Sequence, residues 1–362
     1  AADEADLEGD FLKAAQANKA LAKGLAPFHY RGKGNLRVQL TQPAMQGGDI
    51  RYAAKLLPLG GHLLWDEMPY TLDNVRGEVL IEPNRVTLRD LQATHGKATL
   101  TVGGKVDISA LATRAALVVK TSLPVDDDLL KLIHHLELPL DGKLQTGGTI
   151  SADLKSLSLA WQTVPQGKPA KFDWALDGLL GCAAVQYKDD PKDKTPHTLT
   201  GQARGQFGKS SGVYTINANA ILKEFGIEHV TLRDVRTSLL CRESDRNTLQ
   251  INNLSARCGT GKIAGKASIQ IGDVPDYEFD LSMVDIPLGS LLASADSRKL
   301  MKGNLQGRLS MHYRAATAGK PRIRQAEGDL EIVRAELYQL PLFLETLNVI
   351  ALQLPGKSAF HS

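Results

Sequence analysis

Apolar and polar residues alternate along most of this chain, and this period of two constrains the fold more than any other feature. Leu100, Val102 and Val106 have one parity, whereas Thr101 and Lys105 have the other. The same alternation recurs over residues 36–40, 86–88, 214–222 and 330–332. Because successive side chains of a β-strand point to opposite faces, the pattern predicts antiparallel sheet with one apolar and one solvated face.

The alternation changes phase at two related places. After Leu88 the next apolar residue, Leu91, has the opposite parity, and the same slip follows Ile251. One extra residue in a strand reverses the face that the following side chains take. We therefore predict a β-bulge or a corner at Asp90 and at Asn253.

The first half of the chain resembles the second. Residues 71–76 match residues 231–236, 160 positions later, and residues 86–108 align without a gap with residues 249–271, 163 positions later. Identical pairs in the gap-free alignment are Leu91/Leu254, Ala93/Ala256, Gly96/Gly259 and Ile108/Ile271. The repeat predicts tandem units of about 160 residues. The expected boundaries are 1–122, 123–285 with a loop insertion at 185–197, and a truncated third unit at 286–362.

Four stretches have helical spacing of their apolar residues. One of them opens with Asp126, Asp127 and Asp128, and acidic residues suit the N-terminus of a helix. The predicted helices cover residues 5–25, 125–137, 287–301 and 341–354. We expect the last to pack on the end of the sheet, and the alternative is an interfacial helix on a membrane.

The number of strands limits how the sheet can be arranged. About 16 short strands at about 4.8 Å each would make a sheet about 75 Å wide. Open twisted sheets rarely exceed about 10 strands without curling or splitting. The predicted helices are too few to cover an apolar face of that size. The fold class that we expect is therefore mainly β: an elongated, curled antiparallel sheet, or open β-groove, with a few short helices. Stacked sandwiches with closed cores are the alternative.

Composition argues against several classes of function. The 43 Lys and Arg residues nearly balance the 40 Asp and Glu residues, which gives a net charge of +3. The chain therefore lacks the excess of positive charge that binding of a polyanion requires. Aromatic residues make up only 5%, which is few for stacking bases, so no nucleic-acid partner is expected. The three cysteines form no CxxC pattern, so neither a metal site nor a cofactor is predicted.

Membrane attachment is expected to lie outside this chain. No run of residues approaches the roughly 18 apolar residues of a spanning helix. The chain starts in an acidic stretch without the features of a signal peptide. We expect it to be a segment of a longer protein.

Two glycine-containing motifs resemble those of enzymes. Gly208 to Gly212 fits the GxSxG pattern of a serine hydrolase, which requires a turn from a strand into a helix. Here a strand follows instead, so we predict a hairpin turn, and a hydrolase using Ser210 or Ser211 is a distant alternative. Gly259 to Ala264 fits a dinucleotide-binding pattern, yet strands are expected on both sides. No catalytic residue is predicted.

The order of these motifs resembles the AsmA-like proteins, relatives of TamB and of the bridge-like lipid transfer proteins. The matching segments are a Thr-Leu-x-x-Val-Arg strand at 71–76, a Leu-x-Ala-x-x-Gly turn at 91–96, a Gly-x-Val-Asp-Ile strand at 104–108 and the tail 328–360. The resemblance covers most of residues 25–362. It is strongest over 69–110 and 286–360.

Membership of that family would imply a bacterial inner-membrane anchor, a periplasmic location and a long β-groove. It would also imply a role in moving phospholipids between membranes and in building the outer membrane. The implied partners are phospholipids or other acyl-chain lipids and, through the anchor, a membrane. Protein partners are not indicated.

The sequence therefore leads to a non-enzymatic lipid-handling protein as the first hypothesis. The positions expected to line the groove are Val86, Leu88, Leu100, Val102, Leu249, Ile251, Ile263 and Ile269. The second hypothesis is a structural or protein-binding module, in which the same residues fill closed cores and bind no lipid.

Overall fold

Strands account for nearly all of the chain that the structure describes. The computed structural model describes residues 2–6, 28–41, 51–65, 68–109, 112–135, 143–162, 172–188, 196–227, 230–245, 247–271, 276–291, 301–314 and 323–337. All strands belong to one open sheet of 19 strands within these ranges. The predicted fold class, mainly β with an open antiparallel sheet and few helices, is confirmed.

The residues cluster into two compact units. Unit 1 comprises Ala1–Gly142, Thr146–Leu180 and Gly208–Ser211, and unit 2 comprises Lys143–Gln145, Gly181–Phe207 and Gly212–Ser362. The predicted repeat boundaries, at 122 and 285, stay predictions, because compactness and sequence repetition are different criteria.

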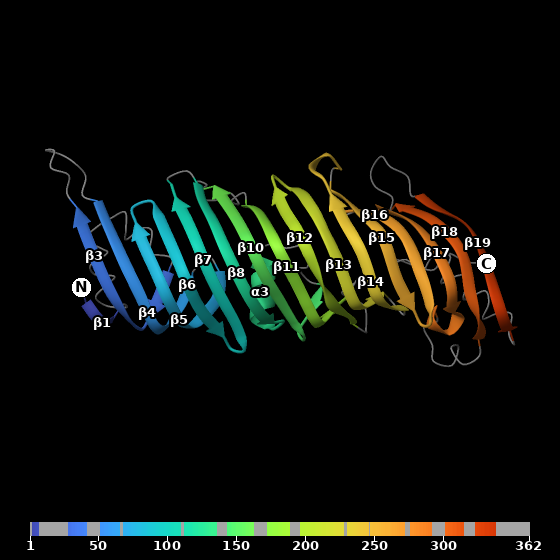
Figure 1. Cartoon of the computed structure of the whole chain (residues 1–362), viewed down its shortest axis with the longest axis horizontal. Helices are drawn as coiled ribbons and strands as arrows, with labels where there is room; N and C mark the ends of the chain where they lie inside the picture. Colours follow the sequence, from blue (N-terminus) through green and yellow to red (C-terminus); the bar gives the residue numbers. More distant parts are fainter. Residues whose placement is uncertain are drawn as a thin grey trace. The chain divides into compact units, whose positions relative to one another are not determined.

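Unit 1 is an antiparallel ladder in which most strands pair with their neighbour along the chain (Figure 1). Its elements are β1 (Ala2–Asp6), β2 (Phe28–Arg31), β3 (Lys33–Thr41), β4 (Arg51–Trp65), β5 (Met68–Glu82), β6 (Arg85–His95), β7 (Ala98–Ile108), β8 (Ala112–Pro124), the helix α3 (Asp127–His135) and β10 (Thr149–Gln162). Strands β11 (Phe172–Tyr187) and β12 (His197–Ser210) contribute residues to both units.

Unit 2 continues with the same antiparallel pairing from β13 to β19. Its elements are β9 (Leu144–Gln145), β12 (His197–Ser210), β13 (Val213–Ile227), β14 (Val230–Cys241), the 3₁₀ turn η1 (Glu243–Asp245), β15 (Thr248–Cys258), β16 (Gly261–Gln270), β17 (Asp276–Pro287), the 3₁₀ turn η2 (Leu288–Leu291), β18 (Met301–Arg314) and β19 (Ile323–Leu337).

Both predicted bulges are present. The pairing of β6 with β7 shifts between Leu88 and Leu91, and Asp90 has a left-handed backbone with φ 48°. The pairing of β15 with β16 shifts between Ile251 and Leu254, and Asn253 has φ 53°. Asp and Asn tolerate this conformation better than most residues. The strands continue through the phase change, so the apolar side chains stay on one face.

The two aligned stretches share other backbone features. Asn74 in β5 has φ 54°, and Asp234, 160 positions later in β14, has φ 51°. Gly96 and Gly259 form the tight turns β6–β7 and β15–β16, with φ 56° and 58°. In both copies the strand after this hairpin, β8 or β17, ends at a proline, Pro124 or Pro287. A helical segment, α3 or η2, follows it. The aligned stretches therefore have the same succession of elements and of left-handed positions.

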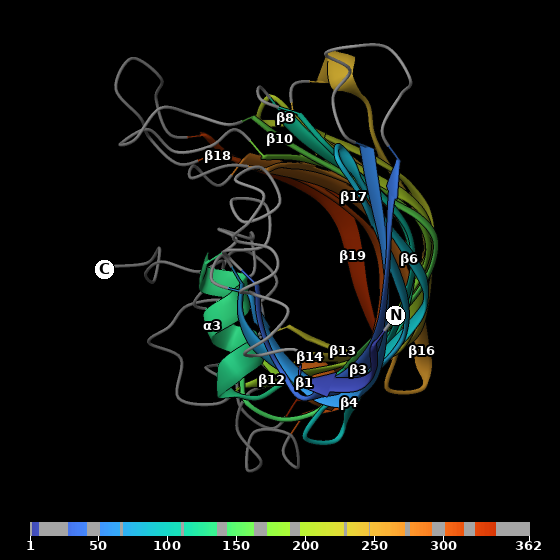
Figure 2. The ribbon, with the colours of Figure 1, turned by 90° about the vertical axis from the view of Figure 1, so that its left-hand side faces the viewer.

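Two glycines near the bulges allow neighbouring strands to approach closely. A Cβ atom at Gly77 would lie 2.7 Å from the Asp90 carbonyl oxygen, and one at Gly104 would lie 2.2 Å from that of Ala116. Bulges and glycine kinks are the usual means of curving a sheet. The strands of unit 1 are strongly curved (Figure 2).

The predicted helices agree only in part with the structure. Residues 127–135 of the predicted helix 125–137 form α3, and the Asp126 carboxylate caps it by accepting a hydrogen bond from the Leu129 N–H at 2.9 Å. The helix predicted over 287–301 is wrong at its end, because Met301 begins β18, and only η2 is described within it. Residues 5 and 6 belong to β1 and not to a helix. The rest of 5–25, and all of 341–354, lie outside the described residues.

Two further sequence features can be compared with the structure: the predicted loop insertion and the GxSxG pattern. Of the predicted loop insertion 185–197, residues 185–187 end β11 and His197 begins β12, while 189–195 lie outside the described residues. The GxSxG pattern is the hairpin turn between β12 and β13, with Ser211 at φ 50° and Gly212 at φ 83°. None of the three cysteines forms a disulfide bond with another described residue, and Cys241 and Cys258 are buried.

Candidate functional site

The four predicted groove positions in unit 1 lie on one face of the sheet. Cross-strand partners point to the same side of an antiparallel sheet. The partners here are Val86 with Val106, Leu88 with Gly104, Leu91 with Val102, and Ala93 with Leu100. The bulge at Asp90 keeps both halves of β6 on this side. Val86, Leu88, Leu100 and Val102 are therefore brought together.

The four predicted positions in unit 2 are brought together by the same arrangement. Leu249 pairs with Ile269, Ile251 with Ala267, and Ala256 with Ile263. The bulge at Asn253 again compensates for the phase change. Leu249, Ile251, Ile263 and Ile269 therefore share one face of unit 2.

This apolar face continues across the neighbouring strands of each unit. In unit 1 the partner rows run Ala54–Ile81–Val86, Leu56–Val79–Leu88 and Val102–Val119–Leu154. In unit 2 they run Ile263–Met283, Ala267–Phe279–Met311 and Ile269–Tyr277–Tyr313. Each unit thus has an apolar strip that crosses several strands, and we call this side the apolar face.

The opposite side, here called the polar face, carries charged side chains in pairs. The Glu78 carboxylate contacts Lys55 at 2.5 Å and Arg89 at 2.8 Å, and Arg85 contacts Asp107 at 2.6 Å. The hydrogen bond from Lys55 is the main cause of the lowered pKa of Glu78. Solvent-exposed pairs of this kind contribute little to folding stability. They show that this side of the sheet faces water.

The predicted groove residues are only partly covered. Seven of the eight are half-buried, and Ile269 is 37% exposed. Residues in the closed cores differ clearly, because Ile286 and Leu288 are 0% exposed and Leu305 is 1% exposed. The strips are mixed, because Ala54, Ile81 and Leu154 are only 1%, 6% and 5% exposed, whereas the predicted groove positions are more accessible. The apolar face is therefore covered at some positions and partly open at others.

Helical segments cover one end of the apolar face in each unit. In unit 1, α3 places Leu132 on a buried cluster of Tyr70, Leu72, Val75 and Ala93, and Leu100 lies at the margin of that cluster. In unit 2, Leu288 of η2 belongs to a buried cluster with Cys258, Met283, Ile286 and Leu305, and Ile263 lies at its margin. Two predicted groove positions, Leu100 and Ile263, thus lie beside a covered end.

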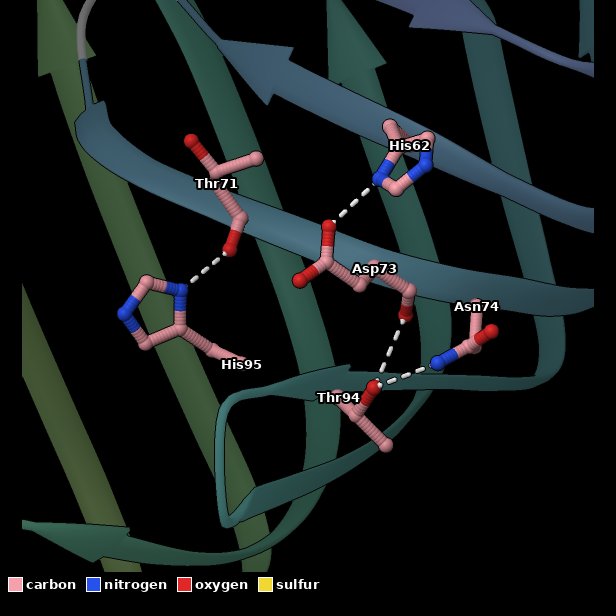
Figure 3. A network of polar contacts seen from close by, with 6 residues as sticks. All are labelled: His62, Thr71, Asp73, Asn74, Thr94 and His95. Atoms are coloured by element: carbon pink, nitrogen blue, oxygen red, sulfur yellow. Dashed lines mark hydrogen bonds and ion pairs between the residues drawn. The ribbon is translucent and has the colours of Figure 1, made fainter.

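A polar network joins β4, β5 and β6 near the end covered by α3 (Figure 3). The His62 ring contacts the Asp73 carboxylate at 2.6 Å, and Asn74 donates a hydrogen bond to the Thr94 hydroxyl at 3.0 Å. The His95 ring bonds the Thr71 carbonyl oxygen at 2.7 Å. This network holds the strand ends together where the bulge at Asn74 interrupts the ladder.

Sequence reasoning did not predict the role of His95, whose side chain connects this network to α3. The His95 ring lies 4.1 Å from the Tyr70 ring between centroids, and its Nε2 atom is 3.3 Å from an Asp128 carboxylate oxygen. Tyr70 is 5% exposed, and its hydroxyl has no hydrogen-bond partner among the described residues. Burial, with Asp126 and Asp128 nearby, raises the pKa of Tyr70 to about 12. Nothing in the local pattern around His95 marks this contact, because its partner is 33 residues away along the chain.

The described residues offer no other candidate chemistry. Within them, no three His, Cys, Asp or Glu side chains lie close enough to hold a metal ion. The same part of the chain contains no helix with the length and apolar character needed to cross a membrane. No protein-family model, curated protein or solved structure matches the chain.

Proposed function

We propose that this protein binds phospholipids or other acyl-chain lipids along the apolar faces of its open sheet, without catalysing a reaction. The observation that carries the proposal is the partial exposure of these faces. Leu88 and Ile251, for example, are half-buried although apolar neighbours surround them in the sheet. Contiguous apolar surface that stays open to solvent usually marks a binding site for a protein, a membrane or an apolar ligand.

The chemistry of the face suits acyl chains. Burial of apolar area stabilises contact by about 25 cal/mol per Å², without a need for directional hydrogen bonds. In unit 1 the strip is lined by aliphatic side chains of similar character, such as Val79, Leu88 and Val119. A uniform surface lets a chain slide along it, because no position binds much more tightly than the next. The arrangement therefore supports movement of lipid as well as its storage.

The resemblance to AsmA-like proteins extends the proposal to a cellular role. We propose that the protein lies in the bacterial periplasm and is attached to the inner membrane by a segment outside this chain. There it would contribute to phospholipid transport between the two membranes and to outer-membrane biogenesis.

The alternative function is a structural or protein-binding module with closed cores. In such a module the eight groove positions would be as inaccessible as Ile286 and Leu305. Their partial exposure favours an open face. A protein partner covering that face would give the same exposure in the isolated chain, so the experiment must detect lipid directly.

The test is quantitative mass spectrometry of the purified chain under denaturing conditions. We expect phospholipid to co-purify at one or more molecules per chain. A globular protein of similar size, purified from the same cells by the same steps, measures the background. Phospholipid at the background level, in chain purified without detergent, would contradict the proposal.

A further inference from the structure

A row of basic residues crosses the polar face of unit 2. Arg233 of β14 is the cross-strand partner of Arg257 of β15, and Arg257 in turn is the partner of Lys262 of β16. Partners in an antiparallel sheet point to the same side. That side is opposite to the apolar face, because Ala256 and Cys258, the two neighbours of Arg257, are buried on the apolar face. Three cations therefore lie side by side, and we call them the basic row.

The charges of the basic row are poorly balanced by carboxylates. All three side chains are exposed. Among the described residues, the row forms one ion pair, from Arg257 to Asp234, with 3.8 Å between nitrogen and oxygen. Glu224 is the cross-strand partner of Arg233, but within that part of the chain no ion pair joins them. Because like charges directly opposite each other destabilise a sheet, the row is unfavourable for the isolated chain.

The fold does not require this row, as the corresponding positions of unit 1 show. Alignment of the two halves places Asp73, Thr94 and Thr99 at the positions of the basic row. These residues are likewise consecutive cross-strand partners. Asp73 contacts the His62 ring, and the Thr94 hydroxyl accepts a hydrogen bond from Asn74. The same strand geometry thus carries neutral and acidic side chains in unit 1, so the cations of unit 2 are not needed for strand pairing.

Apolar side chains border the basic row on the same face. Val284 of β17 is the cross-strand partner of Lys262 and is 50% exposed. Beside the row, the exposed Arg236 of β14 is the partner of Ile221 of β13, which is 48% exposed. Cations next to exposed aliphatic groups are the combination with which peripheral proteins bind anionic lipid surfaces.

We propose that the basic row docks unit 2 on the surface of a membrane that contains anionic phospholipids. Each Lys or Arg near such a surface strengthens binding by about 1 kcal/mol, or about fivefold. The nearly neutral net charge of the chain does not oppose this contact, because charges beyond a Debye length of about 8 Å are largely screened. The site lies on the opposite side of the sheet from the apolar face and does not depend on the proposed lipid-binding function.

The other anionic partner would be an acidic segment of a protein. Extended peptides commonly bind a sheet by adding a strand to a free edge. Here β14, β15 and β16 are each paired with a neighbouring strand on both edges (Figure 1). A peptide would therefore find no backbone groups to pair with at the basic row. A membrane surface needs none, because its head groups are attracted by charge alone.

Flotation of the full chain with lipid vesicles tests the proposal. One set of vesicles contains phosphatidylglycerol in an excess of phosphatidylcholine, and the other contains phosphatidylcholine alone. We expect at least about tenfold tighter binding to the anionic vesicles, and loss of this preference at about 1 M salt, where the Debye length falls to about 3 Å. In the triple variant Arg233→Gln, Arg257→Gln, Lys262→Gln the preference should fall below about twofold.

A matched triple variant in unit 1 removes the same net charge from its polar face. Lys55, Arg85 and Arg89 are already paired with carboxylates. The variant Lys55→Gln, Arg85→Gln, Arg89→Gln should therefore keep the preference for anionic vesicles within about twofold of the parent chain. A loss of preference equal to that of the basic-row variant would show that net charge, and not the row, determines binding.

Three other results would also overturn the proposal. They are equal binding of the parent chain to both kinds of vesicle, an unchanged preference in the basic-row variant, and salt-sensitive binding of a polyglutamate peptide without binding of anionic vesicles. The last result would assign the row to an acidic protein partner. Phospholipid that co-purifies with the chain measures the apolar face separately, and its amount should be the same in the parent chain and the basic-row variant.

Discussion

Gly104→Ala is expected to destabilise unit 1 by about 3 kcal/mol or more, which is a large effect for one added methyl group. Gly104 has φ 135°, a conformation that residues with a side chain rarely adopt. The new Cβ atom would lie 2.2 Å from the Ala116 carbonyl oxygen and 2.8 Å from the Leu117 Cα atom. Both contacts are with backbone, so the paired strands β7 and β8 would have to separate.

The preceding residue provides a matched control. Gly103→Ala places a Cβ atom no closer than 3.8 Å to any atom beyond its two chain neighbours, and it should change stability by less than about 1 kcal/mol. Urea unfolding followed by circular dichroism measures both variants. Equal midpoints would show that the sheet does not depend on a close approach at Gly104, and would contradict our account of its curvature.

Leu88→Asp is expected to weaken phospholipid binding at unit 1 about tenfold while the fold is retained, a loss that corresponds to about 1.4 kcal/mol. Leu88 is half-buried in the middle of the apolar face, between Val79 and Gly104. A carboxylate there keeps access to water in the empty protein. It must lose that water when an acyl chain covers it, which is unfavourable.

Two variants separate this effect from general damage. Thr87→Asp alters the adjacent residue, which pairs with Lys105 on the polar face, and should bind lipid normally. Leu305→Asp buries a charge at a position that is 1% exposed, and should unfold unit 2 at a cost of about 4 kcal/mol or more. Titration with a fluorescent phospholipid and thermal unfolding are the measurements. If Leu88→Asp unfolds like Leu305→Asp, the position belongs to a sealed core.

The bulges show how much of this fold the sequence pattern contains. Alternating hydrophobicity fixes which face each side chain takes, so a reversal of parity after Leu88 or Ile251 requires an extra residue nearby. Asp90 and Asn253 tolerate a left-handed backbone, which places the bulges at these residues. The shared face of the four groove positions within each unit follows from the same reasoning.

The pattern is less informative about the number and length of strands. We count about 16 short strands from alternation, whereas the described residues form 19, and β11 alone has 16 residues. Bulges let one strand continue through a phase change. Glycine-containing stretches without regular alternation, such as β4, also pair because their neighbours supply the ladder.

The contact between His95 and Asp128 lies beyond sequence reasoning for a different reason. The Asp126–Asp128 triplet correctly predicts the start of α3, because the effect of a helix cap is local. The contact of Asp128 with His95 depends instead on how α3 docks on the sheet. A local pattern does not encode that position.

Site-specific photo-crosslinking in cells tests the central claim most directly. A photoreactive amino acid is placed at Leu88 and Ile251 on the apolar face, and at the adjacent residues Thr87 and Gln250 on the polar face. We predict phospholipid adducts at Leu88 and Ile251 and none above background at Thr87 and Gln250. Absence of adducts at all four positions, or equal labelling of the two faces, would contradict the account.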